Sequence, residues 1–162
     1  MRLLRALTLL LFAVFGAPAN AATATGSFQV QITIQATCIL VSATNLNFGT
    51  NGVLSAVINQ TSTINVQCTN TTPYNIGLDA GVNGGSVTTR QMKGGPTNQL
   101  INYSLFSNAG MTQNWGQTIG TDTVAATGNG AAQPFTVFGQ VPAQTTPSPG
   151  LYTDTITVTV TY

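Results

Sequence analysis

The residue types on which most catalytic sites depend are scarce in this sequence. Its 162 residues include no histidine and no glutamate, which excludes a Ser-His-Asp triad and a Cys-His pair. Asp79, Asp122 and Asp154 are far apart, so a carboxylate pair that hydrolyses glycosides would form only if folding brought two of them together. No group of residues has the spacing of a metal site. The sequence therefore predicts a protein that is not an enzyme and that holds no metal and no cofactor.

Two further features could contact a small molecule. The stretch from Gly81 to Gly85 is rich in glycine, but it lacks the Lys-Ser/Thr of a phosphate-binding loop, so a tight turn is expected. Trp115, Tyr74 and Tyr103 could stack on a sugar ring, although such aromatic residues more commonly lie in a core or an interface. We expect no small-molecule substrate, and a monomeric extracellular glycan-binding module is kept as an alternative.

The first 21 residues have the features of a secretion signal. Arg2 and Arg5 precede a short apolar run, and residues 19–21 fit an A-x-A cleavage site. A membrane anchor is the alternative, but the apolar run is shorter than the roughly 20 residues that a spanning helix needs. We therefore expect residues 1–21 to be a signal peptide that is removed during export.

Export bears on the two cysteines, Cys38 and Cys68. Compartments outside the cytoplasm are oxidising, so a disulfide between them is expected, with two buried free thiols as the alternative. On the chain-entropy model the closed loop would stabilise the fold by about 3–4 kcal/mol, because it restricts the unfolded chain.

Charged residues make up 4% of the chain and hydrophobic residues 43%. Beyond the expected signal peptide, the cations are Arg90 and Lys93. Nucleic acid is excluded as a partner, because a nucleic-acid surface needs clustered Lys and Arg. Disordered chains are usually charged and poor in apolar residues, so a folded domain is expected. Weak charge repulsion would also let many copies pack closely.

Short strand-like segments separated by turn residues fill the rest of the chain, without helical periodicity of useful length. Residues 135–141 are apolar on both faces, which is typical of a central strand. Residues 142–150 contain three prolines and cannot be a central strand. This organisation predicts an all-β sandwich. The expected strands are 46–49, 63–69, 74–80, 87–93, 99–108, 135–141 and 153–162, with Asn-Gly turns at 51–52, 83–84 and 129–130.

The longest regular pattern runs from Phe28 to Leu40, with an apolar residue at every even position. No Gly, Pro, Asn or Asp interrupts it. At about 3.3 Å per residue it would extend roughly 43 Å, about twice the length of a typical strand. A bond between Cys38 and Cys68 would tie its second half to the domain. Its first half, from Phe28 to Ile34, then has no evident place in its own sheet.

Burying the four large apolar side chains of that first half would contribute up to about 6–12 kcal/mol. This is comparable with the whole net stability of a domain, and unpaired backbone edges favour pairing with another chain. We therefore expect residues 22–36 to be a donor strand for a neighbouring copy and residues 37–162 to be the receiving β-sandwich domain. Such a head-to-tail contact does not close, so it builds a filament, as in pilin strand complementation. The alternative is an ordinary first strand, bent by a bulge at residues 36–37 and packed in its own sandwich.

A series of short motifs follows this pattern in a characteristic order. After Cys38 come NFG at 47–49, CTNTTPYNIGLDAG at 68–81, R-x-M at 90–92, NYSLF at 102–106, Trp115-Gly116, FTVFGQVPAQ at 135–144 and GLYTDTITVTVTY at 150–162. In their order and spacing these motifs resemble the spore coat protein U domain family. That family includes the major subunits of archaic (Csu-type) chaperone–usher pili.

The resemblance implies an incomplete immunoglobulin-like β-sandwich that lacks its last strand and is completed by a donated N-terminal strand. The donor positions match Phe28, Val30, Ile32 and Ile34. The C-terminal strand that borders the acceptor groove and meets a chaperone matches Ile156, Val158, Val160 and Tyr162.

The resemblance also implies partners and a location. The expected partners are other copies in a fibre, a periplasmic pilus chaperone and an outer-membrane usher. The expected product is a cell-surface pilus for adhesion and biofilm formation, reached through the periplasm. Tip adhesins carry an additional binding domain, for which this chain has no room, so a shaft subunit is expected. Because the family also includes secreted spore-coat components, a coat or surface-layer protein is the alternative.

Overall fold

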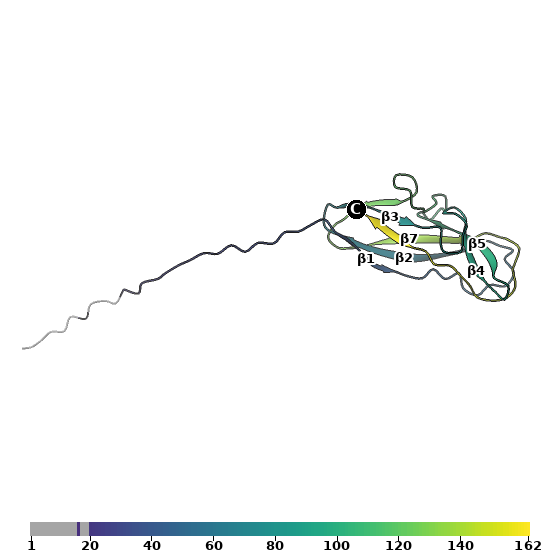
Figure 1. Cartoon of the computed structure of the whole chain (residues 1–162), viewed down its shortest axis with the longest axis horizontal. Helices are drawn as coiled ribbons and strands as arrows, with labels where there is room; N and C mark the ends of the chain where they lie inside the picture. Colours follow the sequence, from purple (N-terminus) through teal and green to yellow (C-terminus); the bar gives the residue numbers. More distant parts are fainter. Residues whose placement is uncertain (1–15, 17–19) are drawn as a thin grey trace, which may run out of the picture. The chain divides into compact units, whose positions relative to one another are not determined.

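The computed structural model describes residue 16 and residues 20–162 (Figure 1). Nearly all of the expected signal peptide, residues 1–15 and 17–19, lies outside the described residues. The chain consists of a segment that ends at Thr33 and a compact domain from Ile34 to Tyr162. Residues 20–33, the described continuous part of the first unit, form neither helix nor strand.

The regular structure in the described residues is entirely β, which confirms the all-β fold class. None of these residues belongs to a helix long and apolar enough to cross a membrane. The strands are β1 (Cys38–Ala43), β2 (Ile58–Cys68), β3 (Pro73–Leu78), β4 (Arg90–Gly94), β5 (Gln99–Phe106), β6 (Val124–Thr127), β7 (Ala132–Val141), β8 (Tyr152–Thr153) and β9 (Val158–Thr161).

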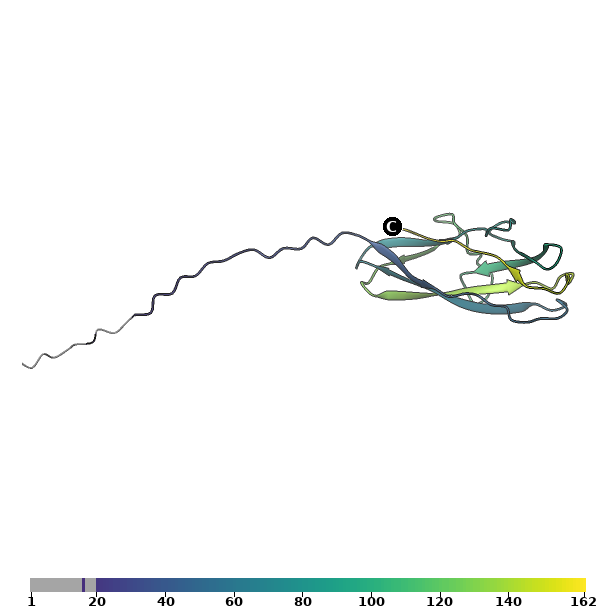
Figure 2. The same ribbon diagram turned by 60° about the horizontal axis from the view of Figure 1, so that its bottom comes forward.

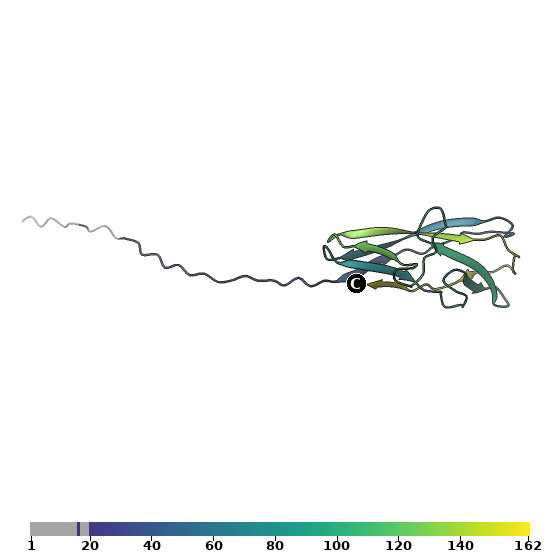
Figure 3. The ribbon, with the colours of Figure 1, turned by 90° about the horizontal axis from the view of Figure 1, so that it is seen from above.

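Within the domain, these strands form two antiparallel sheets. One has six strands in the order β1-β2-β7-β5-β4-β8, and the other has three in the order β6-β3-β9. Figure 2 shows the long strands β2 and β7 side by side, and Figure 3 shows the C-terminal strand β9 next to β3. Strand β1 is therefore at one edge of the larger sheet, and β9 is at one edge of the smaller sheet.

The centre of the larger sheet is the pairing of β2 with β7, which runs from Ile58 opposite Val141 to Gln67 opposite Ala132. The prediction that residues 135–141 form a central strand is confirmed, because β7 also pairs with β5. The core between the sheets contains Val66, Ile76 and Trp115, whose side chains are fully buried.

Two expected strands differ in the structure. Residues 46–49 form no strand; instead, the side chains of Leu46 and Phe48 pack against the core. Gly139 of β7 makes this packing possible, since a Cβ there would lie 2.6 Å from Leu46 Cδ1 and 3.1 Å from Phe48 Cζ. The expected strand 153–162 is split into β8 and β9, because residues 154–157 cross from one sheet to the other.

Candidate functional site

The unpaired edge of β9 is the first feature of the candidate site. β9 pairs with β3 on one side, and no described residue pairs with its other side. β1 lies next to it, at the edge of the larger sheet, but no ladder connects the two strands. Two neighbouring strands thus each leave a row of backbone groups without a strand partner, which is the arrangement that accepts an added strand.

The inward face of β9 is only partly covered. Val158 pairs with Leu78, and Val160 pairs with Ile76. Paired residues on neighbouring strands share one face of a sheet. Leu78 and Ile76 are essentially fully buried, yet Val158 and Val160 are only half-buried. The core therefore lacks cover on the side of β9 that faces away from β3.

β1 shows the same deficit on its own inward face. Leu40 pairs with Val66, whose side chain is fully buried, yet Leu40 is 43% exposed. We refer to Leu40, Val158 and Val160, together with the unpaired edge of β9, as the open edge. Its side chains are apolar, face inward and are only partly covered.

The other predicted acceptor residues lie at the two ends of β9. Ile156 precedes the strand and packs half-buried against the core, while Tyr162 follows the strand and is 60% exposed. The threonines between them are exposed. The alternation seen in the sequence thus separates an inward apolar face from an outward polar face.

The predicted donor residues lie mostly in the other unit, where Phe28, Val30 and Ile32 are 84–88% exposed. Ile34, at the start of the domain unit, is 71% exposed. No residue from 20 to 37 belongs to a strand, although the sequence has an ideal strand pattern there. These apolar side chains are therefore largely exposed to solvent.

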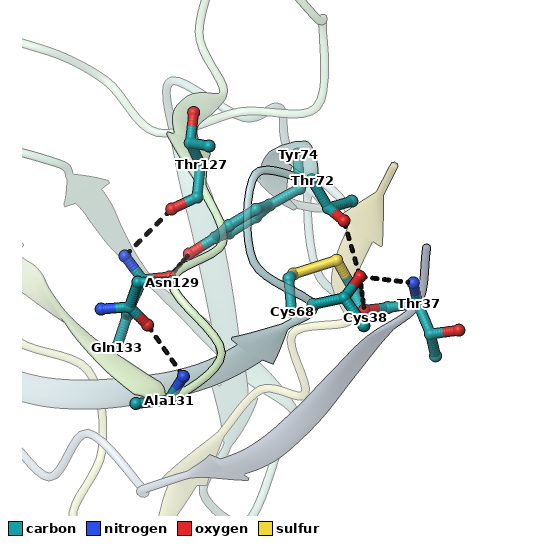
Figure 4. The surroundings of a disulfide bond; sticks show 10 residues. Thr37, Cys38, Cys68, Thr72, Tyr74, Thr127, Asn129, Ala131 and Gln133 are labelled. Atoms are coloured by element: carbon teal, nitrogen blue, oxygen red, sulfur yellow. Dashed lines mark hydrogen bonds between the residues drawn. A yellow bond between two sulfur atoms is a disulfide. The ribbon is translucent and has the colours of Figure 1, made fainter. Parts of the chain in front are cut away.

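The expected disulfide between Cys38 and Cys68 is confirmed (Figure 4). It joins the first residue of β1 to the last residue of β2, and these residues are also a pair in the ladder. On its outer side, the amide of Thr37 donates to Thr69 Oγ1 at 3.1 Å, and Thr69 N donates to the carbonyl of Thr37 at 2.9 Å. Cys68 is buried and Cys38 is half-buried.

Arg90 is the most unusual side chain of the domain, because its charge is fully buried. Its guanidinium donates four hydrogen bonds of 2.7–3.0 Å, all to backbone carbonyls: those of Asp79, Val87, Leu78 and Trp115. Burial lowers the pKa of Arg90, and the negative charges of the nearby Asp79, Asp154 and Asp122 oppose this effect. The arginine thereby fastens the end of β3 to the loop that carries Trp115.

Two aspartates complete this network. Asp79 Oδ1 accepts hydrogen bonds from the amides of Gly81 and Thr157, and the second of these fixes the chain just before β9. Asp154 accepts bonds from the amide of Val82 and from other protein donors. Folding thus brings both carboxylates to the loop at Gly81, where protein donors bond to Asp79 Oδ1 and to both oxygens of Asp154. These hydrogen bonds hold the loops in place.

The structure also places the aromatic residues that the sequence left open as a sugar-binding face. Tyr74, Tyr103 and Trp115 are all buried, so they are core residues and offer no stacking face for a sugar. The described residues contain no cluster of three or more His, Cys, Asp or Glu that could hold a metal ion.

Sequence reasoning missed the roles of Arg90 and of the Asp79 and Asp154 carboxylates. A signal was present, since an isolated arginine in a chain with so few charges is more easily explained by a specific buried contact than by solubility. Its four partners are carbonyls from three separate segments, and a sequence does not show which carbonyls will meet.

The fold can be compared with solved structures. It is similar to one in the crystal structure of the CsuC–CsuE chaperone–tip adhesion subunit pre-assembly complex from archaic chaperone–usher Csu pili of Acinetobacter baumannii. The TM-score is 0.61 and the identity 24%, over 80% of this chain and 41% of that chain. The present chain therefore spans about two fifths of the length of its structural neighbour. The fold defines an all-β, two-sheet domain that resembles a pilin subunit.

The family is defined by sequence. The chain matches the Spore Coat Protein U domain over residues 24–159 and belongs to that family, which confirms the resemblance inferred from its motifs. A curated relative, Protein U of Myxococcus xanthus, is 31% identical over 160 residues, covering 90% of this chain and 88% of that protein.

Proposed function

We propose that this protein is a structural subunit that polymerises head to tail by strand donation into a cell-surface fibre. The open edge carries this proposal. Leu40, Val158 and Val160 face inward beside fully buried partners, and yet they remain only partly covered. An extended apolar strand placed beside β9 would cover all three and pair the free edge.

The N-terminal segment has the composition that such a strand needs. Phe28, Val30, Ile32 and Ile34 alternate with polar residues, so one face of the extended segment is apolar and the other is polar. Burying these four side chains would contribute up to about 6–12 kcal/mol. Each copy would give residues 22–36 to a neighbour and receive the same residues from another, and a chain of such contacts grows without closing.

Export and assembly would require two further partners. A strand-deficient domain exposes apolar residues before it meets the next copy, so we propose that a periplasmic chaperone covers the open edge, with Ile156 and Tyr162 at its ends. An outer-membrane usher would then replace the chaperone by the next N-terminal segment. The similarity in fold to a domain in a chaperone–subunit complex supports this route. The fibre would serve adhesion and biofilm formation at the cell surface, and the protein would not be an enzyme.

A second candidate function is a secreted spore coat or surface layer. The match to the Spore Coat Protein U domain and the relationship to Protein U of Myxococcus xanthus favour it. The same strand donation would link subunits in both cases. Electron microscopy of material sheared from the cell surface distinguishes filaments from a layer.

The proposal is tested by two double variants that carry equal charge. In Ile32→Asp/Ile34→Asp, two carboxylates fall on the apolar face, whereas in Thr33→Asp/Gln35→Asp they fall on the polar face. We expect secretion of both, with fibres formed only by the second variant and the wild type. Fibres should resist dissociation in detergent until boiled, because swapped strands separate slowly. Normal fibres from Ile32→Asp/Ile34→Asp, or a wild type that stays monomeric, would refute strand donation.

A further inference from the structure

The disulfide lies where the N-terminal segment joins the sheet (Figure 4). Cys38 is the first residue of β1, and its pairing with Cys68 is the first of the β1–β2 ladder. Residues 34–37 belong to no strand, and Thr37 has short hydrogen bonds only to Thr69. Any pull on the N-terminal segment therefore reaches the domain at Cys38.

By itself, β1 is poorly attached to the domain. It is an edge strand of six residues whose ladder partner is β2 alone. An irregularity between Leu40 and Ser42 interrupts that ladder, and Ile39, Leu40 and Val41 are each 43–54% exposed. Short edge elements with few buried contacts open at low free energy.

β2, the strand at the other end of the disulfide, is firmly attached to the domain. β2 has 11 residues, pairs with β7 over nearly its whole length, and buries Ile64, Val66 and Cys68 in the core. The disulfide thus connects the exit point of the N-terminal segment directly to a strand inside the larger sheet. The weakly held strand β1 is bypassed.

We propose that the Cys38–Cys68 disulfide is the tension-bearing link of the fibre. This inference rests on the proposed function, because only a strand-donating polymer loads the N-terminal segment. Without the bond, tension draws β1 out of the sheet and then extends the chain up to the start of β2 at Ile58. At about 3.4 Å per residue, the released residues 38–57 would extend to at most roughly 70 Å. With the bond, this segment cannot extend, because the tension passes through the disulfide directly to β2.

Single-molecule stretching of the chain from Ala22 to Tyr162, the exported form expected from the sequence, tests the proposal. Handles are attached through peptide tags, either at both termini or at the exposed Thr97 and the C-terminus. Only the first geometry loads Cys38. When pulled from both termini, Cys38→Ser/Cys68→Ser should show an early extension of up to roughly 70 Å, at a lower force than the main unfolding event. The wild type should show no such step, and in the second geometry neither protein should show it.

If Cys38→Ser/Cys68→Ser does not fold, the folded wild type is tethered first and its disulfide is then reduced with a phosphine. The same early step is expected in that measurement. Absence of the step without the disulfide would overturn the proposal. Equal weakening in both pulling geometries would also overturn it, since it would show that the bond only adds general stability. The measurement uses single chains, so its outcome is separate from whether fibres form.

Discussion

The hydroxyl of Tyr103 donates a hydrogen bond to Oδ2 of Asp154 across 2.7 Å. Tyr103 is a buried residue of β5, and Asp154 begins the crossing from β8 to β9. Burial and this hydrogen bond raise the pKa of Tyr103 far above its ordinary value, so the hydroxyl remains a donor. The contact ties the start of the C-terminal crossing to the larger sheet and so helps to place β9.

Replacing Tyr103 by Phe should therefore destabilise the domain. The change leaves an oxygen of the half-buried Asp154 without its donor, at a cost of about 1–3 kcal/mol. Urea unfolding followed by circular dichroism measures it. Tyr162→Phe is the matched control, because Tyr162 is 60% exposed and should change stability by less than about 0.5 kcal/mol. Equal stabilities of the two variants would contradict the assignment.

Asp79 should make the domain less stable in acid. Partial burial opposes its ionisation, but hydrogen bonds from Thr157 and Gly81 and the charge of Arg90 outweigh this and lower the pKa of Asp79. Since the folded pKa lies below the unfolded value of about 3.9, the stabilisation is fully present above that value. It is lost as the pH falls through the folded pKa.

Asp79→Asn tests this relationship. The variant should be less stable than the wild type at pH 7, and its free energy of unfolding should fall less between pH 6 and pH 3. Asp122 and Asp154 are present in both proteins, so the difference between the two curves isolates Asp79. Parallel curves would show that this carboxylate does not contribute to the pH dependence.

Arg90 should be far more sensitive to substitution than Lys93, three residues along the same strand. Arg90→Met removes the donor to four backbone carbonyls, so we expect a loss of at least about 3–5 kcal/mol and, in the limit, no folded domain. Lys93 is exposed, and Lys93→Met should stay within about 0.5 kcal/mol of the wild type. Thermal unfolding of both variants checks this contrast. A stable Arg90→Met domain would show that the carbonyls find other donors.

The open edge makes a prediction about assembly that does not involve the donor residues. Val158→Asp places a carboxylate on the inward face of β9, and covering it with an apolar strand would cost on the order of 3 kcal/mol or more. Affinity for a donated strand should then fall by more than about 100-fold, and fibres should be lost. Thr159→Asp, on the outward face, should still assemble. Urea unfolding of each monomer confirms that the domain itself is folded.

Much of the fold could be predicted because strand patterns are local. Alternating residues at 156–162 already indicated the inward Val158 and Val160, and the apolar run at 135–141 indicated a central strand. Of the pattern from Phe28 to Leu40, only the end, from Cys38, belongs to a strand within one chain, and the sequence had left its first half without a place in its own sheet. Alternation shows that a segment can form a strand, but the partner that completes it can lie elsewhere.

The sequence by itself determined that this protein is a charge-poor, all-β member of its family, because composition, strand periodicity and motif order are properties of the chain. Only the tertiary structure decided that β1 and β9 lie side by side without a ladder and that their inward side chains stay half covered. It also decided that Arg90 is buried among four carbonyls. These facts depend on which distant strands meet, and long-range pairing is set by the packing of the whole domain and not by any local pattern.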